Sequence, residues 1–175
     1  MARTFRWARL WDVAALLVVA FALWKVFVAP RSLVIAASAQ TAPHASFARL
    51  EGDAFHVTAA RGHVLFLDFY ATWCTPCKIE LPLVVSWANN HAGAIVVPVD
   101  VAEPRRAAQT FAREHGLGNV ALDPHGDSQG TFGVEGLPTV VVVDPQGRIR
   151  AKWQGLNPAI ALAMTHAETS LSNNR

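Results

Sequence analysis

Apolar residues form one long run near the N-terminus of the chain and several short runs after it. The long run extends from Trp11 to Val28, with Lys25 near its end. Its 18 residues are near the short end of what a helix needs to cross a bilayer, about 17–25. Three arginines, at positions 3, 6 and 9, precede it, and this bias favours an N-terminus left in the cytoplasm. We therefore expect residues 1–30 to be a signal anchor, a single transmembrane helix.

A cleaved signal peptide is the competing interpretation of this segment. Ala37-Ser38-Ala39 fits the small-residue pattern of a cleavage site, although it lies well beyond the apolar run. A buried helix of a soluble domain is the third interpretation. Residues 31–45 are rich in Ala and Ser and predict a flexible tether. We expect one domain over residues 46–172, followed by a tail at 173–175.

In the predicted domain, short apolar runs alternate with segments of helical character. The apolar runs predict strands over 64–70, 95–100, 120–122, 139–143 and 148–153, and a hairpin over 47–57. The other segments predict helices over 76–90, 104–115, 127–132 and 158–171, the last with Asn157 as its cap and Pro158 at its first position. Pro82 should kink the first of these helices. Strands and helices in this order predict an α/β fold of three layers with a central mixed sheet.

Composition and charge exclude some classes of function. The net charge of the 175-residue chain is +2, and five of its fifteen Lys and Arg residues lie at positions 3, 6, 9, 25 and 31. No basic block is long enough to indicate nucleic-acid binding, so we expect no nucleic-acid partner. The seven histidines are scattered, and we expect them at the surface rather than around a metal ion.

The candidate chemistry lies in Cys74 and Cys77, the only cysteines of the chain. A disulfide ring this small adds little loop-closure stabilisation, so a purely structural bridge is the weaker interpretation. Half of a zinc site is another, but there is no second Cys-x-x-Cys and no His-x-x-x-His. The pair opens a predicted helix, where free N–H groups and the helix dipole stabilise a thiolate. We predict that Cys74 is the nucleophile and that Cys77 is the more buried, resolving thiol.

Two acidic residues lie close to this pair in the sequence. Asp68 interrupts an otherwise apolar strand, and an unpaired buried carboxylate has a raised pKa. Local hydrogen bonds to Asp68 are the alternative. Glu80 follows Cys77 by three residues, about one helical turn. It is a second acid candidate, with a solvated helix carboxylate as the alternative.

Several stretches together resemble the thioredoxin fold, and specifically its membrane-tethered TlpA/ResA/CcmG-like branch. Residues 68–78, Asp-Phe-Tyr-Ala-Thr-Trp-Cys-Thr-Pro-Cys-Lys, are similar to the thioredoxin active-site run, and Pro82 matches the kink proline that follows. Residues 133–139, Gly-Val-Glu-Gly-Leu-Pro-Thr, resemble the loop that carries the family's cis-proline. Gly147 and Gly155 match the glycines of the final hairpin. The long interval from position 100 to 133 resembles the TlpA-type insertion.

The resemblance implies roles for the two acids. In thioredoxin the aspartate equivalent to Asp68 assists proton transfer at the buried cysteine. Thioredoxin also has a lysine nearby on the adjacent strand, whereas residues 95–99 contain none. The rise in the pKa of Asp68 should therefore be less opposed here. A glutamate at the place of Glu80 tunes the cysteines in the TlpA-like branch.

The resemblance also implies a substrate-binding surface around the disulfide. A cis bond between Leu137 and Pro138 would leave the backbone of Leu137 free to pair with an extended substrate, with an ordinary trans proline as the alternative. Trp73 would be exposed and contact partners, unless it is a core tryptophan. Thr75 and Pro76, between the two cysteines, belong to the same surface and tune the redox couple.

The implied function is that of a membrane-tethered periplasmic thiol:disulfide oxidoreductase that needs no cofactor and no metal. Pro76 has the place that it has in reducing thioredoxins, so we expect a reductase of protein disulfides. Its electron donor would be a DsbD-like transmembrane thiol carrier. Its clients would be exported proteins with thiols or disulfides, such as apocytochrome c or copper-site proteins. We expect a monomer at the bacterial inner membrane, with the domain in the periplasm.

Three other functions stay open on the sequence alone. The first is a periplasmic disulfide oxidant or isomerase. The second is a redox-inert docking module with the same fold, against which the intact Cys74–Cys77 pair and Pro138 argue. The third is a peroxidase-like thiol enzyme of related fold. That enzyme would need a lone peroxidatic cysteine with Thr and Arg nearby, rather than a Cys-x-x-Cys.

Overall fold

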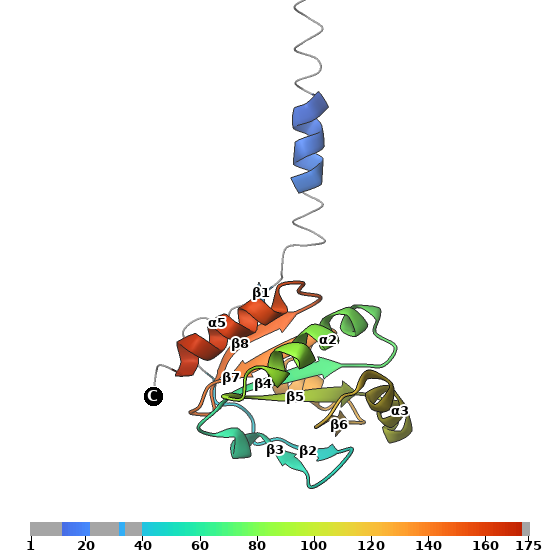
Figure 1. Ribbon diagram of the computed structural model, residues 1–175, viewed down its shortest axis with the longest axis vertical. Coiled ribbons are helices and arrows are strands. Elements are labelled where there is room, and N and C mark those ends of the chain that lie inside the picture. Colours follow the sequence, from blue (N-terminus) through green and yellow to red (C-terminus); the bar gives the residue numbers. More distant parts are fainter. Residues whose placement is uncertain (1–11, 22–31, 34–39, 173–175) are drawn as a thin grey trace, which may run out of the picture.

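A computed structural model describes residues 12–21, 32–33 and 40–172 (Figure 1). Within these residues the strands form one mixed sheet in the order β1-β8-β7-β4-β5-β6-β2-β3. β4, β5 and β6 pair in parallel, and the other neighbours pair antiparallel. The α/β plan with a central mixed sheet, predicted from the sequence, is confirmed.

The elements follow the predicted order. The strands are β1 (Ser32–Leu33), β2 (Ser46–Arg49), β3 (Phe55–His56), β4 (Val64–Tyr70), β5 (Ala94–Val101), β6 (Ala121–Asp123), β7 (Thr139–Val143) and β8 (Ile149–Gln154). The helices are the 3-10 turn η1 (Val57–Ala60), α2 (Thr75–Asn89), α3 (Arg105–His115), α4 (Ser128–Phe132) and α5 (Ile160–Ser172). α5 begins at Ile160 and not at Pro158, because Pro158 and Ala159 form a turn. Asn157 Oδ1 accepts a hydrogen bond from Ala159 N at 3.0 Å, the capping contact predicted from the sequence.

The two faces of the sheet are covered by different elements, because successive side chains of a strand point to opposite faces. On one face Leu65, Leu67 and Phe69 of β4 pack in one cluster with residues of β2, η1 and α4. On the other face Phe66 and Tyr70 pack against α2, α3 and α5. All seven residues of β4 are buried. Asp68 shares the face of Phe66 and Tyr70, and so its carboxyl lies inside the core under α2.

The segment predicted as a tether contacts the sheet wherever the structure describes it. β1 pairs antiparallel with β8. Thr41 forms a bridge with Arg148, and Ile149 N donates a hydrogen bond to Gln40 O at 2.8 Å. Ala42 is buried and joins the hydrophobic cluster of β4. Residues 32–33 and 40–42 therefore line the β8 edge of the sheet, ahead of the predicted start of the domain at 46.

The predicted anchor lies largely outside the described residues. Residues 12–21 are helical, and residues 1–11 and 22–31 are not described. Among the helices that are described, none is long and apolar enough to cross a membrane. The tail at 173–175 also lies outside the described residues.

Candidate active site at the start of helix α2

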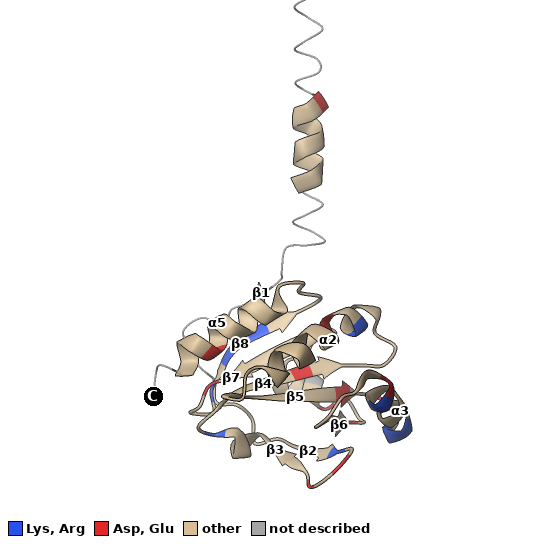
Figure 2. Cartoon of the chain, in the orientation of Figure 1, with Lys and Arg blue, Asp and Glu red and all other residues tan. Residues whose placement is uncertain are grey.

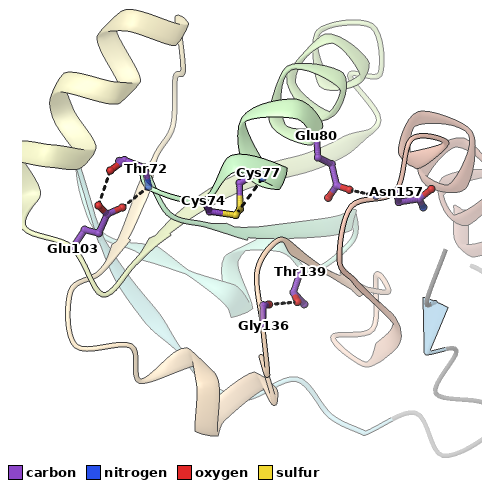
Figure 3. The surroundings of a disulfide bond; sticks show 8 residues. All are labelled: Thr72, Cys74, Cys77, Glu80, Glu103, Gly136, Thr139 and Asn157. Atoms are coloured by element: carbon purple, nitrogen blue, oxygen red, sulfur yellow. Dashed lines mark hydrogen bonds between the residues drawn. A yellow bond between two sulfur atoms is a disulfide. The ribbon is translucent and has the colours of Figure 1, made fainter. Parts of the chain in front are cut away.

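The two cysteines form a disulfide at the N-terminus of α2 (Figure 3). The S–S bond is 2.00 Å and the Cα atoms are 5.3 Å apart. Cys74 is the N-cap residue, and its Sγ accepts a hydrogen bond from Cys77 N at 3.2 Å. Pro76 lies in the first turn, where its missing N–H leaves no gap in the helix. After reduction, the Cys74 thiolate would meet this N–H and the positive end of the helix dipole.

The surroundings of the disulfide are uneven in exposure. Cys74 is 4% exposed and Cys77 is 1% exposed, so Cys77, for which we predict the resolving role, is the more buried of the two, as expected. Trp73 is 68% exposed, which rules out a core tryptophan. Thr75 and Pro76 are exposed as well. The two cysteines are thus buried, whereas the side chains next to Cys74 in the sequence are exposed to solvent.

Asp68 is enclosed on the α2 side of the sheet. It is 1% exposed, and neither carboxyl oxygen has a hydrogen-bond partner, so the local hydrogen bonds considered as an alternative are absent within the described residues. Its register partner on β5 is Pro98. Burial and, second, the charge of Glu80 raise the pKa of Asp68 from 3.8 to about 8. Asp68 can therefore exchange a proton near neutral pH.

Glu80 points from α2 toward the segment before α5. It is 1% exposed, so the solvated helix carboxylate considered as an alternative is wrong. Its Oε2 accepts a hydrogen bond from Asn157 N at 2.5 Å. Burial raises the pKa of Glu80 to about 7, against the opposing effect of this hydrogen bond. Together, Asp68 and Glu80 supply a pair of buried acids whose charges interact.

The loop before β7 contains the predicted cis bond, between Leu137 and Pro138. Leu137 packs against the hydrophobic cluster that holds both cysteines. No hydrogen bond within the described residues involves the Leu137 backbone, whereas Pro138 O accepts one from Gly155 N at 2.8 Å. Gly133 has φ +62° and its carbonyl accepts a hydrogen bond from Lys152 Nζ at 2.7 Å. The loop therefore places the Leu137 backbone, which has no hydrogen bond among the described residues, beside the cluster that contains both cysteines.

The sequence reasoning missed a second group of polar side chains beside the active-site turn. Glu103, after β5, accepts hydrogen bonds from both the backbone and the hydroxyl of Thr72 (Figure 3). Asp100 is buried at the end of β5 opposite Tyr70, and neither its oxygens nor the Tyr70 hydroxyl have a partner. The signal available in the sequence was the placement of Asp100 and Glu103 directly at the end of an apolar run.

Metal ligands and basic residues show no comparable concentration in the described structure. No group of three or more His, Cys, Asp or Glu side chains there could hold a metal ion. The Lys and Arg positions are spread over β2, α2, α3 and β8 (Figure 2). The polar chemistry of the domain is therefore centred on the cysteines and the acids beneath them.

Comparisons with known proteins agree with this geometry. Residues 38–152 match the AhpC/TSA family. The ResA thiol-disulfide oxidoreductase of Geobacillus thermodenitrificans (strain NG80-2) is 32% identical over 113 residues, which are 63% of this chain and 65% of that protein. The alignment thus spans just under two thirds of that relative's length.

Two solved structures of proteins with related names have a similar fold. A Chlorobium tepidum protein described as a thiol:disulfide interchange protein DsbE has a TM-score of 0.71 and 26% identity, over 77% of this chain and 96% of that one. The MTB protein dsbF has a TM-score of 0.64 and 27% identity, over 73% of this chain and 95% of that one.

Proposed function

This chain belongs to the AhpC/TSA family of thioredoxin-fold proteins, and on that premise we propose that it is a thiol:disulfide oxidoreductase acting on other proteins. The observation that carries the proposal is a disulfide at a helix N-terminus with a buried, unpartnered carboxyl beneath it. Relatives named thiol-disulfide oxidoreductase support it. A peroxidase-like enzyme is disfavoured because the two cysteines are bonded to each other.

The reaction follows from the two cysteines in their reduced form. The Cys74 thiolate attacks a client disulfide, forms a mixed disulfide and releases one client thiolate. Cys77 then loses its proton to the Asp68 carboxylate and attacks Cys74 Sγ. This breaks the mixed disulfide, releases the second client thiolate and closes the Cys74–Cys77 bond. Two electrons pass from the protein to the client, which leaves as a dithiol after taking up two protons.

The direction that we propose is reduction of clients. Pro76 between the cysteines, and the absence of a histidine there, support a reducing couple. The closed disulfide would then be the product state, and the protein would need a donor of two electrons. A DsbD-like transmembrane thiol carrier fits that need. Exported thiol proteins, among them apocytochrome c and copper-site proteins, are the clients that we propose.

We also propose that residues 1–30 anchor the domain to the bacterial inner membrane, with the N-terminus in the cytoplasm and the domain in the periplasm. The apolar run and the three arginines before it support this location. Cell fractionation tests it. An uncleaved chain should sediment with membranes and resist extraction by carbonate, whereas a cleaved one should be released with the periplasmic contents.

Insulin reduction tests the activity itself. The full chain in nonionic detergent, reduced by excess dithiothreitol, should accelerate the precipitation of insulin, and Cys74→Ser should abolish the acceleration. A wild-type protein no faster than Cys74→Ser would refute the oxidoreductase proposal. Cys77→Ser should trap a mixed disulfide with its clients in cells, since the resolving thiol is missing. The trapped proteins would identify the client class.

A further inference from the structure

The turn that leads into Cys74 is held from the side by one carboxylate. Ala71 O accepts a hydrogen bond from Cys74 N at 3.1 Å, which closes a turn around Thr72 and Trp73. Thr72 N donates to Glu103 Oε2 at 2.5 Å, and Thr72 Oγ1 donates to Glu103 Oε1 at 2.6 Å. Both donors of one residue thus meet both oxygens of one carboxylate. These bonds link the turn to a segment 31 residues further along the chain.

A second carboxyl accompanies Glu103 on the inner side. Asp100 is 1% exposed and both its oxygens lack a partner. Burial, the charge of Glu103 and a hydrogen bond that protonated Asp100 can donate to Glu103 together raise the pKa of Asp100 to about 7. Asp100 therefore loses its proton near neutral pH and not in the acid range that is usual for an aspartate.

We propose that Glu103 is a positioning residue for thiol exchange at Cys74, and that the buried, unpartnered Asp100 beside it controls how firmly Glu103 is held. This inference rests on the proposed oxidoreductase function and deepens it. While Asp100 is neutral it adds no charge beside Glu103, whose carboxyl accepts the two bonds from Thr72. Those bonds fix the turn, and the turn sets the Cys74 sulfur against the helix N-terminus.

Ionisation of Asp100 adds a second negative charge next to Glu103. The repulsion between the two carboxylates displaces Glu103 and so weakens the two hydrogen bonds from Thr72 that hold the turn. The other groups that face Asp100 are the Tyr70 hydroxyl and, beyond it, Asp68, both on β4. Burial and these acids hold the pKa of Tyr70 above its usual range, so this group stays protonated.

Charged groups on the helices do not replace this anchor. On the outer side, Lys78 of α2 and Arg106 and Glu114 of α3 line the same surface hollow as Thr72. No ion pair joins any of them to Glu103 in the described part of the chain. Glu114 carries an exposed carboxylate on α3 and supplies the matched control.

The test follows the reactivity of Cys74 and needs no client. The reduced full chain in nonionic detergent is alkylated with iodoacetamide from pH 5 to 9, and the rate at Cys74 is read by mass spectrometry. Thr72→Val and Glu103→Gln should each slow alkylation at pH 7 by about fivefold to tenfold, the factor for the net contribution of about one hydrogen bond. The pKa of Cys74 should rise in both variants, because the sulfur is less well held at the helix N-terminus. Glu114→Gln should match the wild type.

Four further variants test the contact between Thr72 and Glu103 and the ionisation of Asp100. Thr72→Ser keeps the hydroxyl that Thr72→Val removes, so its alkylation rate should match that of the wild type. This control separates loss of the hydroxyl bond from poor folding of the Thr72→Val variant. The double variant of Thr72→Val and Glu103→Gln should be slowed by less than the product of the two single factors, since both changes act on the bond from the Thr72 hydroxyl to Glu103. The wild-type profile should contain an inflection near pH 7 that Asp100→Asn removes and Asp68→Asn does not.

Several outcomes would overturn the inference. They are wild-type rates in both Thr72→Val and Glu103→Gln, additive effects in the double variant, or an unchanged inflection in Asp100→Asn. The proposed function fails separately, through the insulin assay. A protein that reduces no insulin but shows these alkylation effects would retain the positioning role and lose the client reaction.

Discussion

Replacing Asp68 with asparagine should change how the stability of the protein depends on pH. The native pKa of this group is about 8 and its ordinary value is 3.8. Between these values the folded protein holds one more proton than the unfolded chain, so stability falls as pH rises. The slope is about 1.4 kcal/mol for each pH unit, which sums to about 5 kcal/mol between pH 4 and pH 9.

The asparagine side chain has no such slope, but it has a constant cost. Its amide takes the place of two carboxyl oxygens without partners, and a buried unsatisfied polar group costs about 1–3 kcal/mol. Asp68→Asn should therefore be less stable than the wild type at pH 4 and more stable by a few kcal/mol at pH 9. The two stability curves should cross between about pH 5 and pH 6.

Urea unfolding of the oxidised full chain in nonionic detergent measures both curves, with the fluorescence of the buried Trp87 and Trp153 as the signal. In the oxidised protein the cysteines are bonded and do not titrate, so they add no slope of their own. Asp53→Asn, at an exposed carboxylate between β2 and β3, should follow the wild type. Parallel curves for the wild type and Asp68→Asn from pH 4 to 9 would refute the argument.

Two further changes probe the surroundings of the disulfide. Glu80→Gln removes the charge that faces Asp68 and should therefore lower the pKa of Asp68. NMR of the labelled carboxyl carbon measures this pKa. An unchanged titration would show that burial alone sets the pKa of Asp68. Lys152→Met removes the donor to the Gly133 carbonyl and should speed backbone hydrogen exchange in residues 133–137, with the alkylation rate of Cys74 unchanged. Equal exchange in both proteins would contradict an anchoring role for Lys152.

The elements of the fold could be predicted from the sequence because each has a local cause. Apolar runs such as Val64–Tyr70 are too short for helices and end at turn residues. Gly116, with φ +63°, ends α3 where the sequence indicated. The start of α5 was predicted too early. Asn157 was recognised as the cap, but the residues between it and Ile160 form a turn and not the first residues of the helix. These features depend on neighbours within a few positions.

The site was predicted only as far as local pattern and resemblance reach. The positions of Cys74 and Cys77 at a helix start were evident, and so was an acid inside β4. The contact of Glu103 with Thr72 was not, because it joins segments that periodicity does not relate. Burial of Glu80 depends likewise on the approach of Asn157, 77 positions away. Contacts of this kind are set by how the layers pack and not by the sequence around either partner.

The pairing of residues 32–33 and 40–42 along β8 bears on how the domain avoids self-association. A bare strand at the rim of a sheet offers its amides and carbonyls to another molecule, and aggregation can begin there. The opposite rim ends in β3, which has only two residues. Residues 32–33 and 40–42 thus do more than lead into the domain: they cover the longer rim of the sheet, so that fewer of its backbone groups are open to another molecule.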